Sequence, residues 1–225
     1  MIGAIVPVHN EEALLGCCLA ALALAARHAA LAGETVRIVV VLDACTDRSA
    51  EIAYSAGVEV VTVAARNVGV ARATGAALLL AAGARWLAFT DADSRVSPDW
   101  LAVQLSLGVE AVCGSICVDD WDGHPTVVRE IFASLYCDAD GHRHVHGANL
   151  GVCASAYRRA GGFPPLPCRE DVALVERLIA IGANIAWSAA PRVATSARIA
   201  ARARGGFGDT LVGWATSGPV SQHGR

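Results

Sequence analysis

Four short, continuous apolar runs occur in the first half of the chain. They are separated by longer stretches that mix Ala with polar residues, and the first and third of these stretches are also rich in Leu. Each run has the length of a buried strand, and each intervening stretch has the length of a helix. Asn10 is the predicted N-cap of the first helix. Strands that alternate with helices predict right-handed βαβ crossovers and a largely parallel sheet. The predicted strands cover residues 2–8, 35–43, 58–63 and 84–90, and the predicted helices cover residues 11–31, 47–55 and 67–82.

The second half of the chain has a less regular pattern, but it still contains both types of element. Ser97 and Pro98 are typical of a helix start, with Ser97 as the N-cap. The amphipathic stretch 169–182 opens with acidic residues and is closed by Gly182, which is typical of a surface helix. We find no repeat and no linker, so the pattern predicts a single α/β domain. The other predicted elements are strands over 109–118 and 183–187 and helices over 126–136 and 154–160.

The composition is that of an ordinary globular protein, with 54% hydrophobic residues and a formal net charge of -3, and nothing in it points to nucleic acid. All 18 basic residues are Arg, which excludes a Lys-containing phosphate loop and a Lys nucleophile. The eight Cys residues lack Cys-x-x-Cys spacing, which indicates reduced thiols and a cytoplasmic protein. The longest apolar stretches, 13–26 and 73–84, are too short for a transmembrane segment; peripheral association with the inner membrane face is left open.

Two carboxylates, Asp91 and Asp93, follow directly on the fourth predicted strand. If the extended conformation continues, both point to the same side, because side chains alternate along a strand. Two neighbouring carboxylates repel each other unless a cation lies between them, and Mg2+ is usually bound by one or two carboxylates together with substrate phosphates. Ligands of open α/β sheets bind beyond the carboxyl ends of the strands. We therefore predict a site for Mn2+ or Mg2+, with an ordinary strand end and polar turn as the alternative.

A second group of potential ligands is the row His142, His144 and His146. Side chains at alternate positions share one face of a strand, so these three imidazoles would meet if the segment were extended. Imidazole is a common metal ligand, but no other ligand cluster accompanies the row. We interpret the segment as a polar strand or loop, with a second metal site as the alternative.

Four short motifs occur in order along the chain: Val6-Pro-Val-His-Asn-Glu-Glu, Asp43 followed by Thr46-Asp47, Asp91-Ala-Asp93, and Gly161-Gly-Phe followed by Glu170-Asp171. This series resembles the family 2 nucleotide-sugar glycosyltransferases of the GT-A fold, over roughly residues 2–190. The resemblance implies one α/β domain with a mostly parallel central sheet flanked by helices. Residues 1–93 would form a Rossmann-like nucleotide-sugar-binding half, residues 94–190 the acceptor-binding and catalytic half, and residues 191–225 a C-terminal tail that acts as a closing loop.

The resemblance also implies roles for individual residues. The acidic pair holds a divalent ion that bridges the donor diphosphate, with Asp93 favoured over Asp91 as the direct ligand. Asp171, in the late acidic motif, is the general base of an inverting reaction, with a role only in the first turn of the helix as the alternative. The residues assigned to the donor are Pro7, Glu11, Asp43, Arg72 and Asp91, with a solvated helix Arg as the alternative for Arg72.

Further assignments rest on position and charge. Arg198, in the tail, adds a positive charge to the diphosphate as a loop closes over it, with an exposed structural Arg as the alternative. Gly147-Ala-Asn149 and the histidine row before it follow the metal motif and precede Glu170-Asp171, so we place them on the acceptor side, with Asn149 as the residue that binds the acceptor. Glu170 is placed there too, mostly as a positioning or capping group.

Together these features predict metal-dependent transfer of a single sugar from a nucleotide-diphosphate sugar, with UDP or another nucleoside, to an acceptor hydroxyl. Leu42 stands where many family members have the first of two adjacent acids, so uracil specificity is not implied. The Gln-x-x-Arg-Trp motif of processive synthases is missing, which favours single addition. The alternatives are a haloacid-dehalogenase-like phosphatase and a non-catalytic nucleotide- or sugar-binding module. A dinucleotide oxidoreductase is disfavoured because the first βα turn lacks Gly-x-Gly-x-x-Gly.

Overall fold

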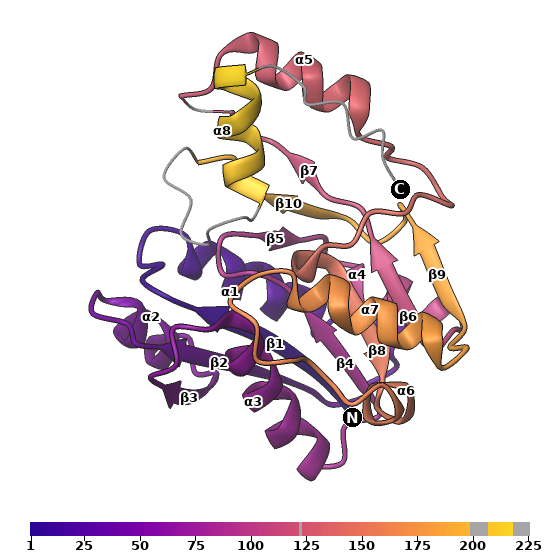
Figure 1. Cartoon of the computed structure of the whole chain (residues 1–225). Coiled ribbons are helices and arrows are strands. Elements are labelled where there is room, and N and C mark those ends of the chain that lie inside the picture. Colours follow the sequence, from indigo (N-terminus) through magenta and orange to yellow (C-terminus); the bar gives the residue numbers. More distant parts are fainter. Residues whose placement is uncertain (122, 199–206, 218–225) are drawn as a thin grey trace.

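A central seven-stranded sheet organises the computed structural model, which describes residues 1–121, 123–198 and 207–217 (Figure 1). The strand order is β3-β2-β1-β4-β8-β6-β9. Strands β1 to β4 pair in parallel, as do β6 and β9, whereas β8 runs antiparallel to both of its neighbours, β4 and β6. The strands are β1 (Ile2–Val8), β2 (Val36–Asp43), β3 (Glu59–Val63), β4 (Trp86–Phe89), β6 (Ala111–Gly114), β8 (Leu150–Cys153) and β9 (Ile185–Ser188).

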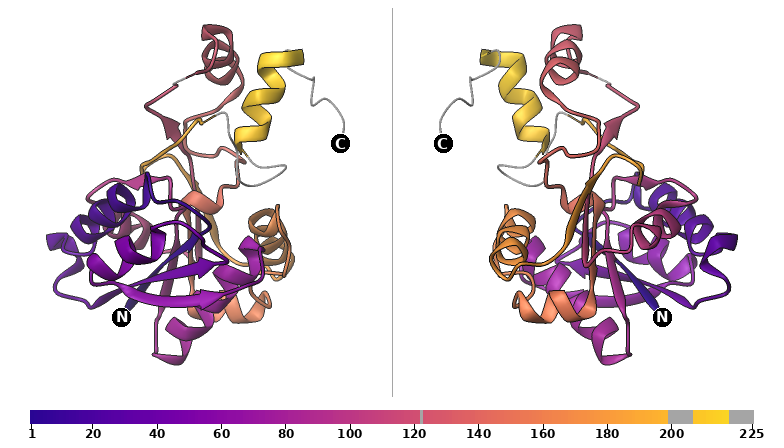
Figure 2. Two further views of the ribbon diagram at one scale, coloured as in Figure 1. Left: turned by 90° about the vertical axis from the view of Figure 1, so that its left-hand side faces the viewer. Right: turned by 90° about the vertical axis from the view of Figure 1, so that its right-hand side faces the viewer.

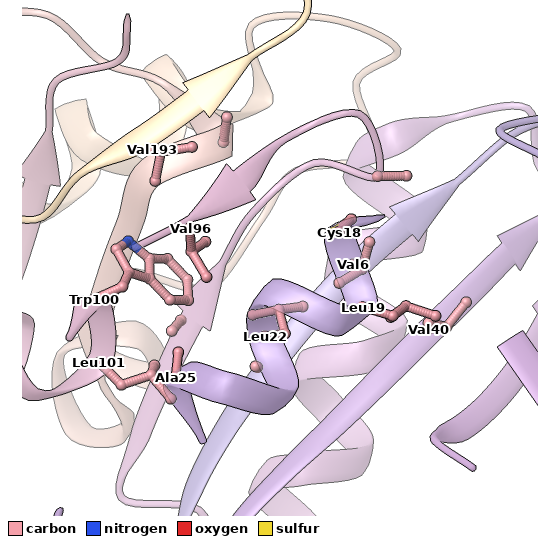
Figure 3. Packing of buried hydrophobic residues seen from close by; sticks show 14 of the residues in the cluster. Val6, Cys18, Leu19, Leu22, Ala25, Val40, Val96, Trp100, Leu101 and Val193 are labelled. Atoms are coloured by element: carbon pink, nitrogen blue, oxygen red, sulfur yellow. The ribbon is translucent and has the colours of Figure 1, made fainter. Parts of the chain in front are cut away.

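Helices cover both faces of this sheet, so two apolar layers form its core (Figure 2). Because side chains alternate along a strand, Val40 contributes to one layer and Val41 to the other. Figure 3 shows the first layer, where Leu19 and Leu22 of α1 pack over the sheet. One face is covered by α1 (Leu15–Ala25), α2 (Ser49–Ser55) and α4 (Trp100–Ser106), and the other by α3 (Val68–Ala81), α6 (Ala154–Arg159) and α7 (Glu170–Ala180).

A second, smaller lobe stands beside the carboxyl ends of the central strands (Figures 1 and 2). It contains a three-stranded sheet and two helices that pack together around Val128, Ala197 and Leu211. Val96 and Val193 of the small sheet pack with the fully buried Trp100, which joins the lobe to the main core (Figure 3). The lobe comprises β5 (Arg95–Val96), β10 (Val193–Thr195), β7 (Cys117–Val118), α5 (Thr126–Leu135) and α8 (Phe207–Ser217).

The predicted α/β class, the mostly parallel sheet and the flanking helices are confirmed. One strand prediction was wrong, and one strand was missed. The stretch 109–118 divides into β6 and β7, which belong to different sheets. The antiparallel strand β8 was not predicted, since its four residues carry no pattern of their own and are specified by pairing with β4 and β6.

Two helix starts also differ from their predictions. Helix α1 begins at Leu15 rather than after Asn10, whose backbone has a positive φ of 56° and whose side chain turns toward the next loop. Helix α4 begins at Trp100, and the Ser97 hydroxyl donates a hydrogen bond to Asp99 instead of capping the helix. Helix α8 was not predicted, and part of the glycine-rich stretch 205–208 and much of the tail lie outside the described residues. No helix in the described ranges is both long and apolar enough to cross a bilayer.

Candidate active site

The loops after β1 and β2 form one wall of the site and are joined by side-chain hydrogen bonds. The Asn10 Oδ1 atom accepts from the backbone N–H of Thr46 at 2.7 Å and from that of Asp47 at 3.3 Å. The Asp47 carboxylate in turn accepts from the N–H of Glu12 at 2.9 Å. Because these short polar side chains bond backbone amides in the opposite loop, the two loops hold each other in place.

Asp43 ends β2 and is almost fully buried. Its carboxylate accepts three backbone hydrogen bonds of 2.7 Å, from Ala65, Arg66 and Asn67. These bonds hold the loop that leads into α3, where the Asn67 side chain caps the helix by accepting from the Val70 N–H. The predicted contact of Asp43 with a nucleoside stays a prediction. A nucleoside that bonds Asp43 would bond a carboxylate that already accepts three backbone N–H groups of the loop.

Backbone conformations with positive φ recur at this edge of the sheet. Asn10, Ala44 and Arg66 each have a φ near 50° and each follows a parallel strand, and Arg169, with a φ of 60°, precedes α7. Non-glycine residues in this region carry a conformational cost and concentrate at functional sites. Here hydrogen bonds to Asn10 and Arg66 help to offset this conformational cost.

Asp91 and Asp93 lie on a turn, because β4 already ends at Phe89 and the Ser94 N–H bonds the Asp91 carbonyl at 3.1 Å. The expectation that they share one face of an extended strand was therefore wrong. Their carboxylates are still close enough to repel each other. Burial, together with the charge of Asp91, raises the pKa of Asp93 to about 6.

Arg72 joins the turn to the late acidic motif. Its guanidinium donates to Asp91 Oδ1 at 2.5 Å and also to Glu170 Oε1, and only 3% of the side chain is exposed. Gly147 lies against it, since a Cβ atom on Gly147 would come within 2.0 Å of the Arg72 Nη1 atom. The alternative of a solvated helix Arg is therefore wrong. Arg72 instead fixes α3, the Asp91 turn and α7 relative to one another.

Asp171 and Glu170 are adjacent, yet the structure places them in different environments. Glu170 is buried against Arg72, and this burial raises its pKa. Asp171 is only partly buried, and its Oδ2 atom accepts the Gly147 backbone N–H at 2.7 Å. The Gly147 amide was not predicted to bond Asp171, because a backbone donor has no sequence pattern. Of the two acids, only Asp171 combines partial exposure with a fixed orientation.

Arg198 approaches the same turn from the residues after β10. Its guanidinium bonds both oxygens of Glu11, at 2.5 and 2.6 Å, and lies 3.1 Å from Asp93 Oδ2. The alternative of an exposed structural Arg does not describe these contacts, since Arg198 bridges two acidic residues of the site. Pro7, also assigned to the donor, lies partly buried near the end of β1.

Asn149 does not face a substrate. Its side chain is fully buried, its Oδ1 atom accepts from the Trp100 indole at 2.8 Å, and its Nδ2 atom donates to the carbonyls of Ser115 and Pro191 at 2.6 and 2.9 Å. The prediction that Asn149 binds the acceptor was therefore wrong. The residue holds the small sheet to the central one.

We expect Asn149→Ala to lower the free energy of unfolding by about 3 kcal/mol, because it leaves the buried Trp100 N–H and two carbonyls without partners. Urea unfolding measures this loss. Asn67→Ala is the control, since that side chain caps an exposed helix start and its removal typically costs about 1 kcal/mol. Equal losses in the two variants would contradict the structural role of Asn149.

The charge of the site suits a cation that arrives with a phosphate group. Around Arg72 and Arg198 five carboxylates outnumber the two guanidiniums, which leaves an excess of negative charge. These carboxylates belong to Glu11, Asp91, Asp93, Glu170 and Asp171. No group of three or more ligand side chains with metal-binding geometry exists among the described residues, so the protein alone does not enclose a metal. Two carboxylates completed by phosphate oxygens and water are, however, the usual setting of Mg2+. The residues present therefore fit a divalent ion bound jointly with a diphosphate.

The histidine row was interpreted as a polar strand or loop, and the structure shows a loop. The His144 ring stacks on Tyr136 with centroids 4.2 Å apart, and the His142 ring stacks on His144. A ring nitrogen of each of the three histidines bonds a protein group. None of the three imidazoles belongs to a metal-binding group in the described part of the chain. The second metal site is therefore not supported.

Solved structures of similar fold are nucleotide-sugar glycosyltransferases. S. aureus TarS 1-349, determined with UDP-GlcNAc, matches with a TM-score of 0.69 and 14% identity, covering 92% of this chain and 61% of that one. The mannosyltransferase PcManGT from Pyrobaculum calidifontis, in complex with GDP-Man and Mn2+, has a TM-score of 0.65 and 20% identity, with coverage of 89% and 58%. Glucosyl-3-phosphoglycerate synthase from Mycobacterium tuberculosis, with Mn2+ and UDP, has a TM-score of 0.59 and 16% identity, with coverage of 98% and 81%.

The chain thus spans about three fifths of the length of the first two of these proteins. At these identities the likeness shows the GT-A fold. A search of curated sequences found no match. The model of the family described as "Glycosyl transferase family 2" matches residues 4–158, which include the loops after β1 and β2, the Asp91 turn and Arg72. On this match the chain belongs to glycosyl transferase family 2.

Proposed function

We propose that the chain transfers a single sugar from a nucleotide-diphosphate sugar to an acceptor hydroxyl, with Mn2+ or Mg2+ and with inversion. The observation that supports this most strongly is the Asp91 turn in a family 2 chain, where Asp91 and Asp93 are each paired with a separate Arg. Arg72, the partner of Asp91, also bonds Glu170, the residue next to Asp171. The related structures with UDP-GlcNAc, and with GDP-Man and Mn2+, support the donor class and the metal.

On the donor side, Asp91 and Asp93 would hold the divalent ion, which neutralises charge that develops on the leaving diphosphate. Pro7, Glu11 and Asp43 border the space proposed for the nucleoside. Arg198 now neutralises Glu11 and Asp93. We infer that the Arg198 side chain exchanges these carboxylates for the diphosphate when the donor binds, because a guanidinium bonds phosphate as readily as carboxylate.

In the chemical step, Asp171 accepts the proton of the acceptor hydroxyl while that oxygen attacks the anomeric carbon of the sugar. The bond from this carbon to the diphosphate oxygen breaks, and the nucleoside diphosphate leaves with the electron pair. Glu170 takes no part in the proton transfer, since it is buried against Arg72. It orients Arg72, and through Arg72 the Asp91 carboxylate.

The test is binding of UDP and GDP by calorimetry, with Mn2+ and then with EDTA. We expect Asp93→Asn or EDTA to weaken binding at least about tenfold. Removing a residue that only hydrogen-bonds a metal ligand typically lowers metal affinity 10- to 100-fold, and loss of the ligand itself should cost at least as much. Asp99→Asn is the control, since Asp99 is an exposed carboxylate six positions further along the chain. Equal affinity with and without metal would exclude the proposed site.

Turnover separates the enzyme from the two alternatives. A panel of UDP- and GDP-sugars, assayed for hydrolysis with Mn2+, is expected to show activity, whereas a generic phosphomonoester is not. Phosphomonoester cleavage that Asp91→Asn abolishes would favour the phosphatase instead. Nucleotide binding without turnover of any sugar would favour the binding module.

A further inference from the structure

A hydrogen-bonded chain from the small lobe ends on His146. The backbone N–H of Ile116 donates to the Tyr136 hydroxyl oxygen at 2.7 Å, and the same oxygen lies 2.9 Å from Nε2 of His146. A phenolic hydrogen lies in the plane of the ring and has two positions there. The Ile116 N–H can only donate, so we assign one of these directions to the hydrogen bond from Ile116 and the other to the Tyr136 hydrogen, which then points to His146.

This donation determines the tautomer of His146. A nitrogen that accepts a hydrogen bond carries no hydrogen, so Nε2 is the bare nitrogen and Nδ1 carries the proton. Burial, with His144 as the next cause, lowers the pKa of His146 to about 3, which keeps the ring neutral. Among the described residues, Nδ1 has no hydrogen-bond partner, and it is not one of the buried unpaired polar atoms, so solvent reaches it.

The position of this N–H links it to the reaction site. The residue after His146 is Gly147, whose N–H holds Asp171 and whose Cα lies against Arg72. Arg72 bonds Asp91, and the charge of Asp91 acts on the His146 ring. In the proposed reaction the transferred sugar would lie between Asp91, whose charge acts on the His146 ring, and Asp171, which bonds the backbone amide next to His146.

The ring of Tyr136 is itself held by stacking. Phe132 of α5 stacks on one side with centroids 4.6 Å apart, and His144 stacks on it at 4.2 Å with an interplanar angle of 9°. The His144 Nε2 atom accepts the Cys137 N–H at 3.1 Å, which fixes that ring as well. The small lobe therefore determines the orientation of His146.

We propose that His146 is a positioning residue that donates a hydrogen bond from Nδ1 to a hydroxyl oxygen of the transferred sugar. The proposal rests on the function proposed above. Because Nδ1 already carries a hydrogen, His146 orients the sugar and accepts no proton from the acceptor, a step that remains with Asp171.

Nitrogen-15 NMR of the full chain with labelled histidine tests the tautomer at pH 7, with the His146 signals assigned by their loss in His146→Gln. We expect the Nδ1–H tautomer in the wild-type protein and a shift toward the Nε2–H tautomer in Tyr136→Phe, which keeps the stacked ring and removes the hydroxyl. Tyr54→Phe, on the exposed surface of α2, is the control. A wild-type His146 that is protonated, or that carries its hydrogen on Nε2, overturns the proposal.

Affinity tests the contact with the sugar. With Mg2+, His146→Gln is expected to weaken binding of the nucleotide-sugar that the wild type binds best by 3- to 10-fold, a typical range for one hydrogen bond, and to leave binding of the matching nucleoside diphosphate unchanged. His146→Asn, whose amide lies near the Nδ1 position, should stay within threefold of the wild type. Equal weakening of both ligands marks a merely structural role and overturns the proposal. If wild-type protein binds no nucleotide, the proposed function itself fails.

Discussion

Replacing Asp171 by Asn is expected to lower the rate of sugar transfer by about 100-fold or more, since a general base typically contributes a factor of 10² to 10⁴. The amide has the size of the carboxylate and still offers one oxygen to the Gly147 N–H, but it accepts no proton. Affinity for the nucleoside diphosphate and the melting temperature should barely change, because Asp171 forms no ion pair with Arg72 or Arg198 and its hydrogen bonds, within the described part of the chain, are with backbone amides. Steady-state kinetics with kcat and KM determined separately measure the effect.

Asp140→Asn is the matched control. Asp140 also accepts a backbone N–H, that of Ala189 at 2.9 Å, and it bonds the Ser188 hydroxyl at 2.8 Å, so this variant disturbs a loop without removing the proposed base. A folded Asp171→Asn protein that binds donor and transfers sugar at the wild-type rate would remove Asp171 from the mechanism. The preference for inversion would then have no support.

Arg72→Met is expected to lower the free energy of unfolding by about 3–5 kcal/mol, the range observed when one partner of a buried ion pair is removed. Glu170, with 5% of its side chain exposed, is left with an unpaired buried charge. Asp91 adds less to this loss, because more than a third of its side chain is exposed to water. Urea unfolding monitored by circular dichroism measures the change.

Two comparisons isolate the cause of this loss. In Arg72→Met/Glu170→Gln the buried charge is absent, so part of the stability should return. Arg85→Met removes an Arg that bonds both oxygens of Glu34, yet 56% of the Arg85 side chain is exposed, so the expected loss is below about 1 kcal/mol. A similar loss in Arg72→Met and Arg85→Met would contradict the buried network.

The sequence alone determined the strands and helices of the first half and the class of the fold. The apolar runs match β1 to β4 closely. The central strands β1, β2 and β4 of this parallel region are covered on both faces and read as continuous apolar stretches, whereas the edge strand β3 is only partly buried. The acidic turn, the late acidic pair and their order along the chain were also readable, since short motifs retain their residue types and spacing. Family membership was predicted from these motifs and is confirmed by the family model.

Only the tertiary structure decided which polar residues face one another. Asn149 is a polar residue in a plausible motif, and its burial depends on the unpredicted strand β8 and on Trp100 from a distant helix. Arg72 lies within an Ala-rich helix, and nothing in that helix shows that two carboxylates, 19 and 98 positions away, converge on its guanidinium. Local patterns specify helices and strands, because hydrophobic periodicity can be recognised within a few residues. The partners of a buried charge, in contrast, depend on how the whole chain folds.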